Sequence, residues 1–241
     1  MSPVSPVMPS EESMKVDFSE IKDKQASNST ASGESNFAVA TKAATVMKAI
    51  LDLNVAIPRT LVKAAQRHNP EYISAGEWEW NYSTEAGGDN FGVRITAKTN
   101  PNNDVTWRFF VTNSATAPPL KDALFFEGRS DFLGTSGKWM YYNPTAEDYE
   151  QVSLITWERN ENIESVDLEV TSDRNDNMGD IIEFNFDGTV KKAIYRDVSS
   201  GETAIISYNT EANTGSILAP GYNNGNRACW DETLKNISCP K

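Results

Sequence analysis

The stretch Gly76-Glu-Trp-Glu-Trp-Asn-Tyr-Ser83 decides the fold, because its large aromatic residues alternate strictly with polar ones. A second stretch, Phe91-Gly-Val-Arg-Ile-Thr-Ala-Lys98, alternates in the same way. Alternate side chains of a β-strand point to opposite faces, so each stretch predicts a strand that is buried on one face. Nine further strands are predicted on the same grounds, over Val105–Val111, Leu124–Glu127, Lys138–Tyr142, Val152–Trp157, Val166–Val170, Ile182–Phe186, Val190–Tyr195, Ala204–Tyr208 and Ser216–Leu218.

The connections between the predicted strands are short and rich in Gly, Asn, Asp and Ser. Short connections force neighbouring strands to run antiparallel, because a parallel crossover needs about a dozen residues or more. Asp187-Gly188 is the clearest hairpin signal, since a type I′ turn takes positive φ at both central residues. The strands are therefore expected to form a meander.

The segment before the strands predicts helical structure. Over 36–54 the sequence is rich in Ala, and its apolar residues recur at the spacing that forms one apolar face on a helix. Pro58 suits the first position of a second, shorter helix over 59–67, which Asn69-Pro70 then ends. We expect a helical hairpin over residues 36–68, with a single bent helix as the alternative.

A long antiparallel sheet does not stay flat, because the twist between neighbouring strands accumulates. The Ala-rich helix is the natural cover for its concave face. The predicted fold class is mainly β (α+β), with a long antiparallel meander that forms a curved sheet or incomplete barrel packed on the N-terminal Ala-rich helix. A sandwich of two sheets is the alternative architecture.

The first 35 residues differ in composition, with three Pro and a run of Ser, Thr and Asn. Such a composition is typical of a linker, so residues 1–35 are predicted to be a flexible N-terminal tether. Within it, Met14–Ile21 carries the large apolar residues and is the one piece that could dock on the rest of the chain. Residues 36–241 are predicted to form a single β-rich domain.

The chain has 241 residues, of which 39% are hydrophobic, and a formal net charge of −12. This hydrophobic content is enough for a substantial core. The negative charge repels phosphate backbones and opposes self-association, so we expect no nucleic-acid partner and a monomer. The longest apolar stretch, 37–57, contains Lys42, Lys48 and Asp52 and does not predict a membrane span.

Two cysteines, Cys229 and Cys239, lie close together in the sequence. A continuous helix would hold their Cα atoms roughly 15 Å apart, whereas a disulfide needs about 4.4 to 6.8 Å. We predict a disulfide that closes the loop 229–239 in a segment that turns back, because the bond would hold a chain end against fraying. A disulfide indicates an oxidising compartment. Two unrelated buried thiols and half of a metal site are the alternatives.

Five segments carry a resemblance to a known family: PSEESMKVDFSEI (9–21), FAVATKAATVMKAILDLNVAIP (37–58), GEWEWNYS (76–83), DFLGTSGKWMYYNP (131–144) and ACWDETLKNISC (228–239). They resemble a family of uncharacterised lipoproteins of Bacteroidota and related bacteria, over nearly the whole chain. In that family the first segment follows a lipobox cysteine, which is absent here, so the membrane tether that the resemblance implies belongs to a precursor with that cysteine. The predicted shape is also similar to the half-barrel of lipoprotein carriers. We expect an extracytoplasmic location, in the periplasm, on the outer-membrane surface or secreted.

Six aromatic residues on the predicted strands are candidate ligand-binding residues, namely Trp78, Trp80, Trp107, Trp139, Tyr141 and Trp157. Because they recur at every second position of the strands, the simplest interpretation is that they pack in the core. If the helix does not fill the curved sheet, the same side chains would line a hollow for an apolar chain or form a platform on which sugar rings stack. The predicted ligand is therefore apolar or a glycan.

Asp173, Asn175 and Asn177 offer oxygen ligands at alternate positions, as a calcium loop does. The pattern departs from such a loop, because the glycine comes one position late and Phe184 stands where the twelfth-position Glu belongs. An Asn- and Asp-rich turn between strands is the simpler interpretation, with weak Ca²⁺ binding as the alternative. No other cofactor is predicted.

No catalytic residue is predicted. The single histidine, His68, follows the second predicted helix, and no G-x-S-x-G motif supplies a nucleophile for it. Glu77 and Glu79 point to the same side of their strand, roughly 7 Å apart, which suits paired carboxylates in glycoside hydrolysis. Alternating Glu is also the ordinary solvent face of a half-buried strand.

These observations give three functional hypotheses. The preferred one is a non-enzymatic, extracytoplasmic (cell-envelope) binding or carrier-like protein for an apolar or glycan ligand. The alternatives are a structural or interaction module of the envelope with a filled core, and a carboxylate-dependent hydrolase. The preferred hypothesis rests on the succession of tether, helix and meander together with the missing catalytic residues.

Overall fold

The computed structural model describes residues 4–18, 21, 35–146, 148–160, 164–172 and 177–240. Strands make up 47% of the residues and helices 18%, which confirms the mainly β prediction. The strands follow one another in sequence order within one sheet, so the alternative of a two-sheet sandwich is wrong. Strands β1 and β14 each have one neighbour, so the sheet is open and is not a closed barrel.

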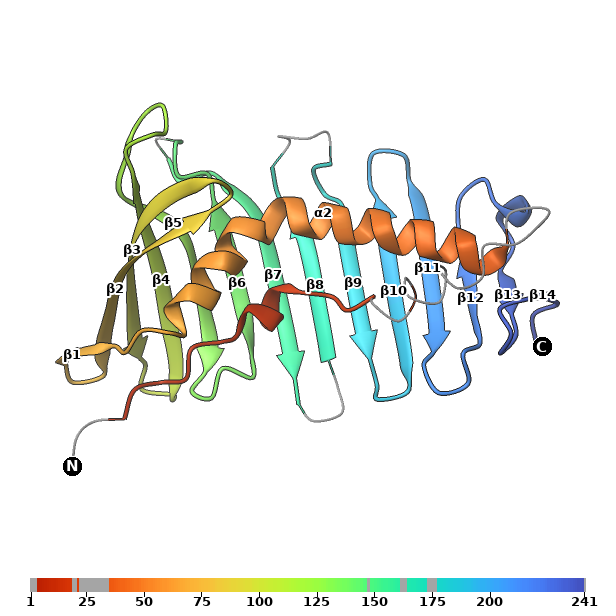
Figure 1. The fold of residues 1–241 in the computed structure, drawn as a ribbon, viewed down its shortest axis with the longest axis horizontal. Helices are drawn as coiled ribbons and strands as arrows, with labels where there is room; N and C mark the ends of the chain where they lie inside the picture. The colour runs from red at the N-terminus through yellow and green to blue at the C-terminus, as the bar shows by residue number, and fades with distance from the viewer. Residues whose placement is uncertain are drawn as a thin grey trace. The chain divides into compact units, whose positions relative to one another are not determined.

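The described elements are one long helix, two short 3₁₀ helices and fourteen strands (Figure 1). The helices are η1 (Glu11–Met14), α2 (Asn36–Ala65) and η2 (Asn223–Gly225). The strands are β1 (Glu71–Ser74), β2 (Glu77–Ala86), β3 (Asp89–Thr99), β4 (Asp104–Asn113), β5 (Leu120–Asp131), β6 (Ser136–Tyr142), β7 (Gln151–Arg159), β8 (Glu164–Val170), β9 (Ile181–Phe186), β10 (Val190–Asp197), β11 (Glu202–Asn209), β12 (Gly215–Leu218), β13 (Ala228–Trp230) and β14 (Asn236–Ile237).

All eleven predicted strands are confirmed, and the strand pairings described are antiparallel. Three short strands, β1, β13 and β14, were not predicted. Every residue of β1 is exposed and every residue of β13 is buried, so neither shows the alternation that identifies a half-buried strand.

The Asp187-Gly188 hairpin is confirmed, but not as a type I′ turn. Of the two residues only Gly188 has a positive φ, of 92°. The Asp187 carboxylate accepts hydrogen bonds from the backbone N–H groups of Thr189 (3.0 Å) and Val190 (2.7 Å). The side chain thus organises the turn that the backbone was expected to form alone.

The helical hairpin predicted over 36–68 is wrong, because α2 is one helix of 30 residues with Pro58 inside it. The Pro ring removes one intrahelical hydrogen bond. Buried residues nevertheless continue at helical spacing beyond it, through Leu61 and Ala65. Tertiary packing of this apolar face outweighs the local signal to break the helix. No helix among the described residues has the length and apolar character needed to cross a membrane.

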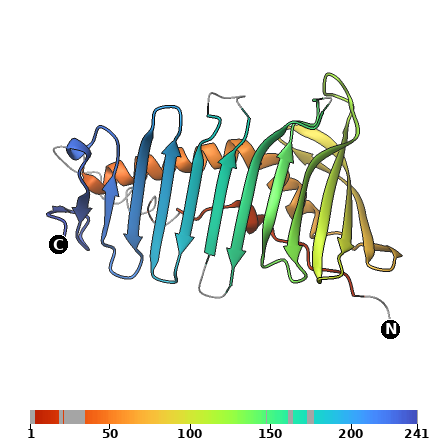
Figure 2. The ribbon, with the colours of Figure 1, turned by 180° about the vertical axis from the view of Figure 1, so that it is seen from behind.

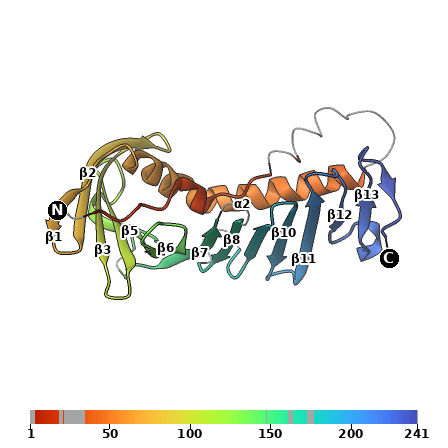
Figure 3. The same ribbon diagram turned by 90° about the horizontal axis from the view of Figure 1, so that it is seen from below.

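The chain forms two compact units, where the sequence predicted a tether and one domain. Unit 1 comprises residues 1–14, 54–159 and 170–172, and unit 2 comprises residues 15–53, 160–169 and 173–241. In unit 1, the first strands curve around the C-terminal part of α2 (Figure 3). In unit 2, the N-terminal part of α2 lies along one face of the strands and leaves the opposite face of β9 to β11 uncovered by α2 (Figure 2).

Residues 4–18, which we call the strap, lie within the predicted tether, but residues 4–14 are packed within unit 1 and residues 15–18 within unit 2. In unit 1 the indole Nε1 of Trp139 donates a hydrogen bond to Ser13 Oγ (3.1 Å), and Met14 is fully buried. In unit 2 the ring of Phe18 meets that of Phe184 edge-on at 5.6 Å. The expected docking of Met14–Ile21 is thereby supported, while residues 1–3, 19–20 and 22–34 of the predicted tether lie outside the described residues.

The predicted disulfide between Cys229 and Cys239 is confirmed, with a Cα–Cα distance of 5.1 Å. It joins β13 to the segment that follows β14. Residues of this loop hold the first residue of α2, because Asn36 Nδ2 donates to the Cys229 carbonyl (2.6 Å) and Asn36 N–H donates to Asn236 Oδ1 (2.8 Å). The loop therefore supplies acceptors to a helix N-terminus, where backbone donors lack intrahelical partners.

Candidate ligand-binding face of unit 1

The six predicted ligand-binding aromatic residues all lie in unit 1 and all are buried. Their side chains are between 0% and 6% exposed. The rings pack on one another, with Trp139 stacked on Trp157 at 5.3 Å and Trp80 tilted against Trp107 at 5.7 Å. These aromatic residues therefore form the core of unit 1.

Three polar atoms within this core have no hydrogen-bond partner among the described residues, namely Tyr141 OH, Ser153 Oγ and Trp157 Nε1. Burial raises the pKa of Tyr141 well above its usual value. Two other indoles are satisfied, because Trp107 Nε1 donates to Ser130 Oγ (2.9 Å) and Trp139 donates to the strap. The unpaired atoms face the interior and not an accessible surface.

The two carboxylates predicted for a hydrolase lie on the opposite, outer face of β2, as the alternation indicated. Glu77 accepts hydrogen bonds from Lys98 Nζ (2.8 Å) and Ser74 Oγ (2.8 Å), which lower the pKa of its carboxyl group. The general acid of a glycoside hydrolase needs a raised pKa, so Glu77 is unsuited to that role. Glu79 accepts a hydrogen bond from Asn81 Nδ2 (2.7 Å).

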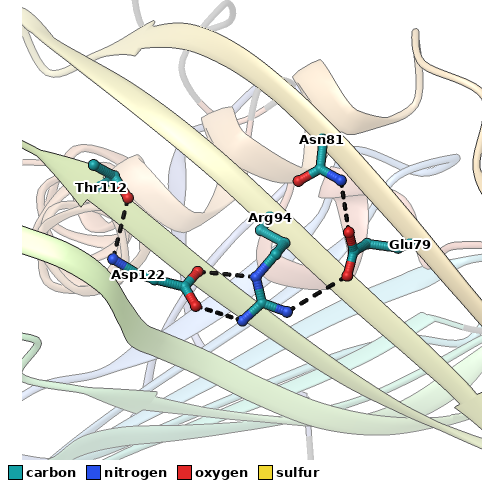
Figure 4. A network of polar contacts seen from close by, with 5 residues as sticks. All are labelled: Glu79, Asn81, Arg94, Thr112 and Asp122. Atoms are coloured by element: carbon teal, nitrogen blue, oxygen red, sulfur yellow. Dashed lines mark hydrogen bonds and ion pairs between the residues drawn. The ribbon is translucent and has the colours of Figure 1, made fainter.

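Arg94 is the centre of a polar network on this outer face (Figure 4). Its Nε and Nη2 donate to the two carboxylate oxygens of Asp122, at 2.9 and 2.6 Å. Its Nη1 lies 3.6 Å from the Glu79 carboxylate, and its guanidinium carbon lies 4.1 Å from the centre of the Phe110 ring. The hydrogen bonds with Asp122 raise the pKa of Arg94. The guanidinium is thus fixed by a bidentate fork and an aromatic support.

Strand register brings these residues together. Asn81, Arg94 and Phe110 are cross-strand neighbours on β2, β3 and β4. Asp122 reaches the group because the β4–β5 pairing is irregular between Val111 and Asn113. The bulged segment places Asp122 in a left-handed conformation, with φ of 50°, and its N–H donates to Thr112 Oγ1 (3.1 Å). Bulges commonly redirect side chains at functional sites.

An open depression of about 430 Å³ lies over these strands, and we call it the Arg94 depression. It is lined by Asn81, Tyr82, Ser83, Gly92, Val93, Arg94, Thr112 and Asp122. Gly92 also lines the depression and is the cross-strand neighbour of Ser83 and Thr112. A Cβ at Gly92 would meet Thr112 Cβ at 3.6 Å and the Thr112 carbonyl oxygen at 3.9 Å, which are ordinary contacts, so the fold does not require glycine there.

Of the remaining positions singled out in the sequence, His68 and Asn177 lie among the described residues. The ring of His68 stacks on Tyr82 at 4.9 Å, and its backbone N–H donates to the Ala65 carbonyl at the end of α2. Of the predicted calcium ligands, Asp173 and Asn175 lie outside the described residues. The carbonyl of Asn177 accepts a hydrogen bond from the Asp180 N–H (3.1 Å). Across the described part of the chain, no three His, Cys, Asp or Glu residues are grouped to hold a metal.

Sequence reasoning did not single out Arg94, Thr112 or Asp122. The alternation around Arg94 does predict that its side chain points outward, so the direction of this side chain could be predicted from the sequence. Nothing in the sequence marks the irregular pairing that brings Asp122 to it. Comparison with known proteins gives no matching family model, no matching curated protein and no matching solved structure.

Proposed function

We propose that this chain is a non-enzymatic, extracytoplasmic binding protein and that the Arg94 depression receives a glycan. The proposal rests on the guanidinium of Arg94, which lines an open depression and is fixed there by its bidentate pairing with Asp122 and by the Phe110 ring 4.1 Å away. The resemblance to envelope lipoproteins stays a prediction, and the disulfide supports an oxidising compartment.

The chemistry of the lining suits a hydroxyl-rich ligand. Arg94 and Asn81 supply planar donors, Asp122 supplies acceptors, and Ser83 and Thr112 supply hydroxyl groups. A sugar ring presents adjacent hydroxyl groups that donate and accept at fixed spacing, which such side chains match. The fixed fork means that little side-chain entropy is lost when a ligand binds.

The same geometry disfavours an apolar ligand on the accessible surface. The aromatic side chains expected to line a hollow are buried in the core of unit 1 and are already in contact with one another. A filled core is also what the structural-module hypothesis expects. That hypothesis is therefore the second candidate, and the two differ in whether the Arg94 depression binds a ligand.

Glycan binding is tested by presenting the folded protein to an array of neutral and acidic glycans, followed by calorimetric titration with soluble chitohexaose, maltohexaose and cellohexaose. Binding by the natural chain is expected to weaken about 10- to 100-fold in Arg94→Ala, the range for losing hydrogen bonds to a charged group. Gly92→Thr is expected to weaken binding similarly, because its side chain fills the depression without requiring a new backbone conformation.

Arg108→Ala is the matched control. Arg108 lies on the same face and pairs with Glu127 (3.1 Å), but it does not line the depression. Arg108→Ala removes the same positive charge as Arg94→Ala. Unchanged binding in Arg108→Ala would therefore show that the loss in Arg94→Ala comes from the contacts of Arg94 and not from the change in net charge. Absence of binding to every glycan on the array, or equal losses in Arg94→Ala and Arg108→Ala, would overturn the proposal and favour the structural module.

A further inference from the structure

Unit 2 carries a depression of its own on the outer face of β8, β9 and β10. Its volume is about 390 Å³, close to that of the Arg94 depression. It is lined by Ser165, Asp167, Glu183, Phe184, Asn185, Lys192 and Ile194.

The unit 2 depression adjoins an Arg–carboxylate fork of the same kind as that of unit 1. Arg196 Nη2 donates to Glu183 Oε2 (3.1 Å), and Nη1 donates to Oε1. These hydrogen bonds raise the pKa of Arg196, as those with Asp122 raise the pKa of Arg94. In both units a carboxylate that lines the depression is held by a bidentate guanidinium from another strand, since Arg94 on β3 holds Asp122 on β5 and Arg196 on β10 holds Glu183 on β9.

Strand register again places the polar groups in rows across the depression. Ser165 pairs with Asn185, and Asn185 pairs with Lys192. The next row contains Asp167, Glu183 and Ile194. The row of hydroxyl, amide and ammonium groups offers donors and acceptors side by side, as the unit 1 lining does.

The charges in and beside the unit 2 depression nearly cancel. The lining carries two negative charges, on Asp167 and Glu183, and one positive charge, on Lys192, while the adjoining Arg196 neutralises Glu183. So small a residual charge favours neither a strongly anionic nor a strongly cationic ligand. It suits a neutral, hydroxyl-rich molecule.

We infer that the unit 2 depression is a second binding site for the same class of ligand, so that one chain binds two neutral glycan segments. This inference rests on the proposed function of the Arg94 depression. A polysaccharide repeats the same unit many times, so two sites on one chain would raise the apparent affinity for polymer wherever both can be engaged.

The number of sites is measured by calorimetric titration of the full chain with whichever of chitohexaose, maltohexaose and cellohexaose binds the natural protein. Two binding events per chain are expected. Gly92→Thr and Ser165→Val are each expected to leave one event, and the double variant to leave none. Ser216→Val places the same substitution on β12 of unit 2, two strands from Lys192 and outside the lining, and is expected to keep both events. Circular dichroism confirms that each variant is folded.

The variants distinguish failure of the second site from failure of the proposed function of the Arg94 depression. One event in the natural chain that is abolished by Gly92→Thr and untouched by Ser165→Val would overturn the second site and leave the proposed function standing. An event abolished by Ser165→Val alone would overturn the proposed function of the Arg94 depression. No event with any of the three oligosaccharides would remove both.

Discussion

The indole of Trp139 lies against the backbone of Gly128 on the neighbouring strand, so closely that a Cβ at Gly128 would come 2.3 Å from Trp139 Cε3. Gly137 and Gly215 stand in the same relation to Trp157 and Trp230 on their neighbouring strands. Gly128→Ala is therefore expected to lower the free energy of unfolding by about 3 kcal/mol, since an inserted methyl group forces packed side chains or backbone to move. Urea unfolding monitored by Trp fluorescence measures the loss.

Gly92→Ala is the control for that prediction. It adds the same methyl group to the same sheet, but the nearest atom would be 3.6 Å away. Its free energy of unfolding is expected to stay within about 1 kcal/mol of the natural value. Equal losses in the two variants would show that the close approach of Trp139 is not what requires glycine at position 128.

Reduction of the Cys229–Cys239 bond is expected to destabilise the protein by about 3 kcal/mol in the loop-entropy model. The loop also supplies the acceptors for Asn36 at the start of α2, so its release removes contacts from unit 2. Hydrogen exchange of the first turn of α2, measured with and without dithiothreitol, should show faster exchange in the reduced protein. Unchanged exchange there would mean that the loop does not hold the helix.

Stability is expected to fall in acid partly because of Asp131. Burial raises the pKa of its carboxyl group, but hydrogen bonds from Thr135 and Ser136 outweigh burial and leave the pKa below its usual value. A lowered pKa in the folded state stabilises the fold above the unfolded pKa of about 3.9, and this stabilisation is lost as the pH falls through the folded pKa. Asp131→Asn should flatten the acid limb of unfolding free energy against pH. An identical acid limb in both proteins would contradict this role.

The strap is expected to behave as part of the core. Phe18 is 3% exposed and packs on Phe184, so Phe18→Ala should lower the free energy of unfolding by about 3 kcal/mol. Val4 is 75% exposed, and Val4→Ala should change the free energy of unfolding by less than about 0.5 kcal/mol. A flexible tether would instead tolerate both substitutions equally.

The sheet was predictable from the sequence because alternation is a local property of each strand. Trp78 and Glu79 belong to opposite faces whatever the rest of the chain does. The strap was harder, since Met14, Val16 and Phe18 also alternate but stand among Pro and Ser residues that indicate a linker. Their burial depends on partners far away in the sequence, such as Phe184.

The candidate site was only half predictable for the same reason. The outward direction of Arg94 follows from its strand, whereas its fork with Asp122 depends on an irregular pairing between two other strands. At Pro58 the local signal was misleading. Proline predicted the start of a new helix, but α2 continues through it because its apolar face remains buried as far as Ala65. Local rules fail where tertiary contacts decide.

Glycan binding at the Arg94 depression can be followed residue by residue from backbone amide shifts in NMR spectra recorded with and without chitohexaose, maltohexaose or cellohexaose. If the depression binds the glycan, the shifts in unit 1 centre on Gly92, Arg94 and Thr112 and disappear in Gly92→Thr. Shifts centred on the indole N–H groups of the buried Trp139 and Trp157, or no shifts with any of the three oligosaccharides, would contradict glycan binding at the Arg94 depression.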